Sequence, residues 1–105
     1  MLRSTLWQGL LALTLTSQAL AASSPEQRGQ FFAKTHCARC HSIEHAGASP
    51  FDPAPPFRDL HRRYPIETLS EALAEGISTG HPAMPEFQLT PDQIHDLLSF
   101  LKTLE

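Results

Sequence analysis

Cys37-Ala38-Arg39-Cys40-His41 follows the pattern C-x-x-C-H, in which two cysteines and a histidine lie within five residues. This pattern is the attachment signature of a c-type haem. Residues three apart on a helical turn face the same side, so both sulfurs can form thioethers with the vinyl groups of one porphyrin. The histidine then brings its imidazole under the ring centre as the proximal iron ligand. A disulfide or redox pair and half of a zinc site are the competing interpretations.

The start of the chain has the features of a secretory signal. Met1-Leu2-Arg3 is short and positively charged, residues 6–15 are mostly apolar, and Ala19-Leu20-Ala21 offers a small-x-small cleavage site. The apolar run is shorter than the roughly 20 residues that a transmembrane helix needs. We therefore expect a signal peptide over residues 1–21, one exported domain over residues 22–105, and no permanent membrane span after cleavage. An uncleaved N-terminal anchor is the alternative.

Cleavage after Ala21 would leave 84 residues with a formal charge of −4, because Arg3 leaves with the signal. No basic surface typical of nucleic-acid binding is present, so we expect no nucleic-acid partner. A domain this small rarely buries enough apolar surface without crosslinks, a metal or a cofactor. A disulfide between Cys37 and Cys40 would close too short a loop to stabilise it much. A covalently held haem, which gives the core an apolar plate to pack on, is therefore favoured.

Two capping patterns predict the first and the last helix. Ser24-Pro25-Glu26-Gln27 and Thr90-Pro91-Asp92-Gln93 each place a hydroxyl residue at the N-cap, proline at N1 and glutamine at N3. We expect helices over about residues 25–35 and 91–104. Gly29 inside the first of these costs about 1 kcal/mol relative to alanine, which suggests close approach by another element.

The middle of the chain combines a third helix with proline-rich loops. Apolar residues recur at helical spacing over residues 65–75, and Gly76 is a natural C-cap. Four prolines exclude regular structure from residues 45–56, which we expect to form an extended surface loop. Residues 57–64 have room for a short helical turn. No window alternates apolar and polar residues as a strand would, so the predicted class is all-α.

A six-coordinate haem needs a second iron ligand on the face opposite His41. Met84 is the only methionine left after removal of the signal, and Pro82 and Pro85 bracket it. A methionine that only filled the core would be expected on the apolar stripe of a helix. We therefore expect Met84 to be the distal ligand, with His81 as the second candidate. The remaining histidines are expected at helix ends or facing solvent, and they are His36, His45, His61 and His95.

Over about residues 25–104 the chain resembles the class I c-type cytochromes, the small single-haem electron carriers of bacterial periplasms. The matching features are Gly29 and Phe32, the C-A-R-C-H pattern, Ala54-Pro55-Pro56-Phe57, Met84-Pro85 with Phe87, and Phe100 in the last helix. The resemblance implies a cytochrome c fold, in which three main helices and their loops wrap around one covalently attached haem. It also implies that the first and last helices cross, with Gly29 and Phe32 meeting Phe100 or Leu101.

The resemblance further implies a proline carbonyl that accepts a hydrogen bond from the proximal imidazole. Pro55 is the preferred candidate over Pro56, and its role would be to fix the tautomer of His41 and enrich its electron density. The tryptophan that some members use near a haem propionate is missing from the mature chain. Propionate contacts could come from Arg58, Arg62 or Tyr64, or these residues could form a solvated basic turn.

These features predict a periplasmic one-electron carrier with a single haem c. Iron held between His41 and Met84 has no open position for a substrate, so we expect no enzymatic activity. The expected partners are a dehydrogenase or an oxidase, and the expected state is a monomer. A haem c subunit of a periplasmic dehydrogenase or oxidase complex is the alternative. A thiol oxidoreductase using Cys37 and Cys40 is disfavoured, because no strand precedes the motif.

Overall fold

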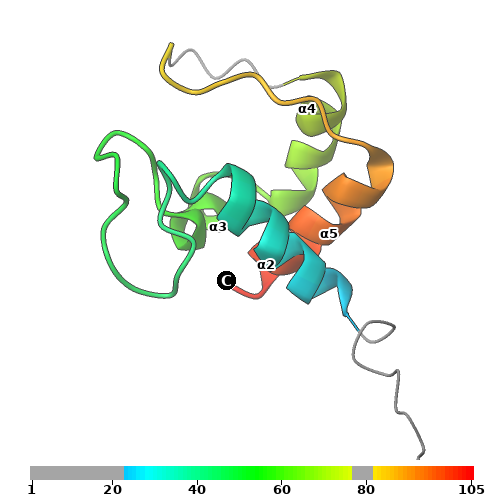
Figure 1. Ribbon diagram of the computed structural model, residues 1–105, viewed down its shortest axis with the longest axis horizontal. Helices are drawn as coiled ribbons and strands as arrows, with labels where there is room; N and C mark the ends of the chain where they lie inside the picture. Colours follow the sequence, from blue (N-terminus) through cyan, green and yellow to red (C-terminus); the bar gives the residue numbers. More distant parts are fainter. Residues whose placement is uncertain (1–22, 77–81) are drawn as a thin grey trace, which may run out of the picture.

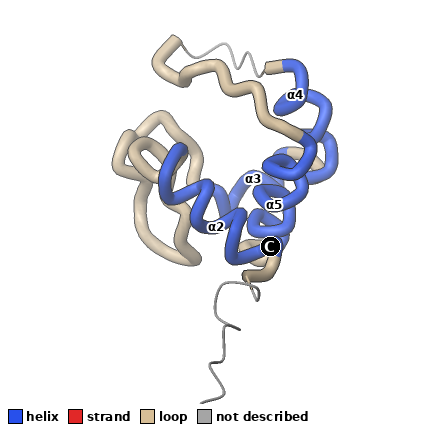
Figure 2. The backbone as a smooth tube through the Cα atoms, turned by 45° about the vertical axis from the view of Figure 1, so that its right-hand side comes forward, coloured by secondary structure: helices blue, strands red, loops and turns tan. Residues whose placement is uncertain are grey.

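The computed structural model describes residues 23–76 and 82–105, so the predicted signal peptide and His81 lie outside the described residues. In this part of the chain the regular structure is helical, and the predicted all-α class is confirmed (Figure 2). None of the described helices is long and apolar enough to cross a membrane. The elements are α2 (Pro25–His36), η1 (Phe57–Asp59), α3 (Leu60–Arg63), η2 (Ile66–Thr68), α4 (Leu69–Glu75) and α5 (Pro91–Lys102).

Both predicted capping patterns form complete capping boxes. The backbone N–H of Gln27 donates to the hydroxyl of Ser24 at 3.1 Å, and the Ser24 N–H donates to the Gln27 side chain at 3.0 Å. Thr90 and Gln93 exchange the same pair of bonds at 3.3 and 3.0 Å. These bonds satisfy backbone donors that the first helical turn would otherwise leave without partners. The two helices therefore begin where the sequence predicts.

The helix ends differ slightly from the predicted ranges. α2 continues to His36, one residue beyond the predicted end, and α5 ends at Lys102. Leu104 thus lies in a turn after α5, yet it is still buried, so the apolar stripe extends beyond the helix itself. Gly76 is the C-cap of α4 with φ of +100°, a conformation that favours glycine, as predicted.

α2 and α5 cross at close range near the centre of the molecule (Figure 1). A Cβ atom at Gly29 would overlap the backbone carbonyl of Asp96 and lie 2.8 Å from the Cβ of Phe100. Ala33, one turn further on the same face of α2, is fully buried. The predicted contact of Gly29 with Phe100 is therefore confirmed. Phe32 packs at the edge of the core, with its ring centroid 4.5 Å from that of His36.

The hydrophobic core lies around this crossing and extends to α3, η2 and α4. It combines residues from the helices with Ile43 and Leu89 from connecting segments and Leu104 from the turn after α5, so these segments pack on the helices. Its buried members are Ala33, Ile43, Phe57, Leu60, Ile66, Leu73, Leu89, Ile94, Leu97, Phe100, Leu101 and Leu104.

Two pairs of charged side chains bridge elements far apart in the sequence. Arg28 of α2 donates two hydrogen bonds to the carboxylate of Asp96 in α5, at 3.0 and 3.1 Å. Lys102 at the end of α5 lies 2.8 Å from the carboxylate of Glu67 in η2. Both pairs are partly or largely exposed, so we expect them to orient the helices more than to stabilise them.

We predict that Gly29→Ala lowers the free energy of unfolding of the haem-containing protein by about 2–4 kcal/mol, because the added methyl group would push α2 away from the backbone of α5. Denaturant unfolding would measure this loss. Gln30→Ala is the matched control, since Gln30 is exposed on the same helix and its replacement should change stability by less than about 0.5 kcal/mol. Equal stability of the two variants would contradict the close crossing.

Candidate haem-binding site

The C-x-x-C-H segment forms a single turn directly after α2. The backbone N–H of Cys37 donates to the carbonyl oxygen of Ala33 at 2.8 Å, so the turn continues the hydrogen bonding of the helix. The N–H groups of Cys40 and His41 both donate to the carbonyl oxygen of Cys37, at 3.1 and 3.0 Å. Both cysteines are free and half-buried. The two thiols and the imidazole are therefore held on one turn, as the motif predicts.

The imidazole of His41 is oriented by the backbone of the proline-rich loop. Its Nδ1 lies 2.7 Å from the carbonyl oxygen of Pro55, the residue preferred over Pro56 on the family resemblance. A carbonyl oxygen can only accept, so Nδ1 carries the proton and donates. The lone pair of Nε2 is then left for a metal ion, which is the tautomer that a haem ligand requires.

The loop of residues 42–56 is closed at its neck by several hydrogen bonds. The N–H of Phe57 donates to the carbonyl oxygen of Ser42 at 2.9 Å, and the N–H of Phe51 donates to the carbonyl oxygen of Cys40 at 3.1 Å. Ser49 accepts a bond from the Ser42 N–H through its hydroxyl at 3.0 Å. This closure brings Pro55, 14 residues away in the sequence, next to His41.

Arg58 has a place that the sequence did not indicate. Its guanidinium donates to the hydroxyl of Ser42 at 3.3 Å and to the carbonyl oxygen of Glu44 at 3.4 Å, so it also closes the loop neck. Arg62 pairs with Asp59 at 3.4 Å and is largely exposed. No sequence signal links Arg58 to Ser42, because the contact joins residues 16 positions apart across an irregular loop.

Phe57 is a second site residue whose contact the sequence did not predict. Its ring centroid lies 4.8 Å from that of His41, with the ring planes tilted by 38°. The side chain belongs to the buried core. The imidazole of His41 therefore has a hydrogen bond at one edge and an aromatic ring against it.

The environment of Cys37 disfavours the redox-pair interpretation. Burial raises the pKa of the Cys37 thiol to about 11, whereas reactive thiols need a lowered pKa. A thioether carries no charge and can be buried without this cost. A structural zinc site takes four ligands. In residues 23–76 and 82–105, no group of three or more His, Cys, Asp and Glu side chains is placed to hold a metal ion.

Met84 lies in the segment that connects α4 to α5. It is half-buried, and the prolines on either side are exposed. The segment is tied to α4 because the N–H of Leu89 donates to the carbonyl oxygen of Leu73 at 2.9 Å. In Figures 1 and 2 residues 82–90 begin at the upper left, away from α4, and run back past α4 to the start of α5, apart from the turn that follows α2. The role of Met84 as an iron ligand stays a prediction.

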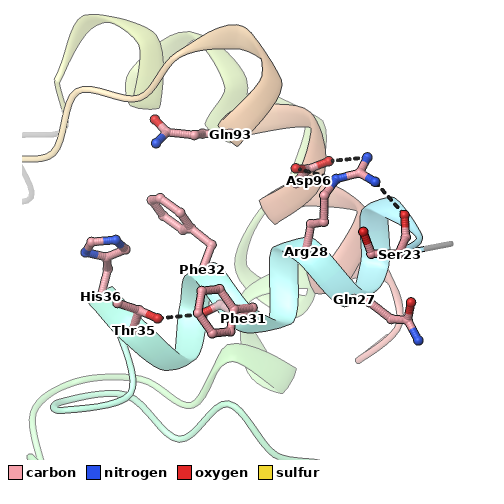
Figure 3. Close-up of a pocket in the computed structure, with 9 residues that line it drawn as sticks. All are labelled: Ser23, Gln27, Arg28, Phe31, Phe32, Thr35, His36, Gln93 and Asp96. Carbon is pink, nitrogen blue, oxygen red and sulfur yellow. Dashed lines mark hydrogen bonds and ion pairs between the residues drawn. The ribbon is translucent and has the colours of Figure 1, made fainter. Parts of the chain in front are cut away.

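A cavity of about 430 Å³ lies along α2 near the start of α5, and none of the predicted haem ligands lines it (Figure 3). Arg28 spans it by bonding to Asp96 and to the carbonyl oxygen of Ser23. The cavity involves none of those ligands, and His36, which directly precedes Cys37, is the lining residue next to the cysteine turn. Its lining residues are Ser23, Gln27, Arg28, Phe31, Phe32, Thr35, His36, Gln93 and Asp96.

The sequence model of the family described as "Cytochrome c" matches residues 26–105, which include the cysteine turn, the loop and the described helices except Pro25, the first residue of α2. The chain belongs to the cytochrome c family. Its all-α arrangement is that of the cytochrome c fold, with helices and loops in place of strands in the described part. This cytochrome carries a covalently bound haem c and transfers electrons to redox partners.

Two relatives of this cytochrome have matching lengths. It is 32% identical over 88 residues to a "Cytochrome c-553-like" protein of Synechocystis sp., which covers 84% of this chain and 77% of the relative. It is 32% identical over 95 residues to "Cytochrome c-552" of Bradyrhizobium diazoefficiens, which covers 90% and 88% of the two chains. No solved structure gives a significant match.

The residues of the turn fit a haem c. Two free thiols on one turn and an imidazole whose Nδ1 lies against a carbonyl oxygen are the groups that this cofactor needs. When bound, the haem supplies an iron that accepts or donates one electron. Cys37 and Cys40 would hold the porphyrin through thioethers. His41 would bind the iron and influence its electron density.

We predict that the purified protein keeps its haem through denaturation and acid–acetone extraction, because thioethers to Cys37 and Cys40 survive both. The Cys37→Ser/Cys40→Ser variant should release any haem that it binds. Absorbance of the extracted protein and of the solvent measures the partition. His95→Ala is a control, since His95 is exposed on α5, and it should behave as the parent protein does. Release of haem from the parent protein would overturn the assignment.

Proposed function

We propose that this cytochrome is a periplasmic one-electron carrier whose haem iron is ligated by His41 and Met84. Cys37 and Cys40 supply the thioethers, and Pro55 accepts the hydrogen bond that orients His41. The observation that carries this proposal is the 2.7 Å contact between His41 Nδ1 and the Pro55 carbonyl oxygen. A second partner on the non-coordinating nitrogen is typical of histidines that bind metals.

The His/Met ligand pair would suit a carrier. A thioether sulfur is a soft ligand that favours Fe(II), so it raises the reduction potential relative to two histidines. Two fixed protein ligands leave the iron no open position for a substrate, which is why we propose no enzymatic role. Met84 lies between prolines, which restrict the backbone and reduce the entropy lost when the segment is held at the iron.

The surface beside the cysteine turn is accessible to a redox partner. Lys34, His36 and Arg39 are exposed on and just after the last turn of α2. We propose that a dehydrogenase or an oxidase docks here weakly and briefly. Transient redox encounters typically bury less than about 1,200 Å² in total. Export through the signal over residues 1–21 and a monomeric state complete the proposal.

One observation favours the alternative that this chain is a subunit of a larger redox complex. Phe31 is 72% exposed on α2, next to the cavity that Phe32 also lines. A permanent subunit would need an apolar surface of this kind, whereas an isolated exposed phenylalanine is also common on monomers. Recovery of a stoichiometric partner with the tagged protein from native periplasm would establish the subunit role over the free carrier.

Met84→Leu should lower the reduction potential and abolish the weak far-red absorption that arises from sulfur bound to ferric iron, because leucine cannot ligate. Spectroelectrochemistry measures both. His81→Ala is the matched variant at the competing position and should leave both unchanged. An unaltered far-red spectrum in Met84→Leu would remove Met84 from the site. Absence of that absorption from the parent protein, with a potential that changes in His81→Ala and not in Met84→Leu, would replace Met84 with His81.

His41→Ala should leave little haem-containing protein, because the proximal ligand and its bond to Pro55 are lost together. Haem content per polypeptide, from the pyridine haemochrome spectrum and the intact mass, provides the measurement. The same mass should show one haem and a polypeptide that starts at Ala22. Normal incorporation and a normal spectrum in His41→Ala would contradict the proximal role, and a retained N-terminus would contradict cleavage after Ala21.

A further inference from the structure

We propose that Phe57 is a positioning residue that restricts rotation of the His41 imidazole and so sets the orientation of this ligand at the iron. The inference rests on the proposed function, because it takes His41 as the proximal ligand. It assigns a role to the aromatic ring beside the imidazole, which acts in addition to the hydrogen bond to Pro55.

The hydrogen bond to Pro55 constrains only one edge of the imidazole. A single bond of 2.7 Å fixes the direction of Nδ1, yet the ring can still rock about the line that joins Nδ1 to its acceptor. Phe57 is in the position to restrict that motion. Its ring centroid lies 4.8 Å from that of His41 at a tilt of 38°, within the range at which aromatic rings attract one another.

Phe57 is itself held firmly. Its side chain is 8% exposed and forms part of the core, and its N–H donates to the carbonyl oxygen of Ser42 at 2.9 Å. Ser42 directly follows His41 in the chain. The backbone of Phe57 is therefore bonded to the residue next to the one that carries the imidazole. Arg58 adds a bond to the Ser42 hydroxyl at 3.3 Å from the next residue along. Movement of the Phe57 backbone away from Ser42 would break this hydrogen bond, and burial in the core restricts the Phe57 ring.

Pro55 and Phe57 therefore act from one tripeptide. Pro55 supplies the acceptor for Nδ1 and Phe57 supplies the aromatic ring. The hydrogen bond from Phe57 to Ser42 keeps both residues next to His41. In a low-spin ferric haem the plane of the axial imidazole influences how unpaired spin spreads over the porphyrin. The pattern of shifted haem methyl resonances thus reports the orientation of the His41 ring.

The test compares Phe57→Leu with Phe57→Tyr and with Phe100→Leu in the haem-containing protein. Phe100 is the matched control, because it is 5% exposed in the same core but lies at the α2–α5 crossing. Two quantities are measured: the paramagnetic shifts of the haem methyl groups in the ferric protein, and the hydrogen exchange rate of His41 Nδ1–H in the ferrous protein. Denaturant unfolding of each variant gives its loss of global stability.

Phe57→Leu should change the order or spread of the methyl shifts and speed Nδ1–H exchange at least about tenfold beyond what its global stability loss explains. Phe57→Tyr keeps the ring and should restore the parent pattern. Phe100→Leu should lose stability with unchanged methyl shifts. Parent-like methyl shifts and exchange rates in Phe57→Leu, with His41 still bound to the iron, would overturn this inference and leave the proposed function intact.

Two further outcomes keep the inference separate from the proposed function. Nuclear Overhauser contacts between the Phe57 and His41 rings in the unmodified ferrous protein are expected, and their absence would overturn the inference even if the variants failed to fold. A different result would refute the proposed function: normal haem incorporation and an unaltered spectrum in His41→Ala.

Discussion

The hydrogen bond from His41 to the carbonyl oxygen of Pro55 is the interaction on which the arrangement of the site depends. It joins the cysteine turn to the far end of a loop that has no regular structure of its own. Without that bond, neither the tautomer nor the direction of the imidazole would be defined. The bond also requires that residues 42–56 close on themselves, and the contacts of Ser42 with Phe57 and Arg58 provide this closure.

The close crossing of α2 and α5 holds in place the helix from which the cysteine turn continues. Gly29 lets the two backbones touch, and buried Ala33 continues the same narrow face toward Cys37. The turn of cysteines follows α2 without a break, since the N–H of Cys37 still bonds to Ala33. The thiols therefore lie on a turn that continues directly from the helix packed on α5. A small domain with two cysteines gains its rigidity here from backbone contact and from its cofactor.

Local features of the sequence predicted well wherever neighbouring residues decide the outcome. Ser24 and Thr90 begin their helices as expected, and Gly76 ends α4, because capping and positive φ involve only a few consecutive residues. The choice of Pro55 needed a family resemblance, since spacing alone left Pro56 open. The contacts of Phe57 with His41 and of Arg58 with Ser42 were not predicted, because they cross an irregular loop whose path no periodicity describes.

By itself the sequence determined the chemistry of this protein: two thiols and a histidine at haem spacing, an all-α chain, and the starts of its first and last helices. These follow from covalent spacing and from hydrogen bonds between residues three or four apart. The tertiary structure decided what surrounds the imidazole, and why Gly29 cannot carry a side chain. Those answers depend on segments distant in the chain, which only the closed core brings within contact of one another.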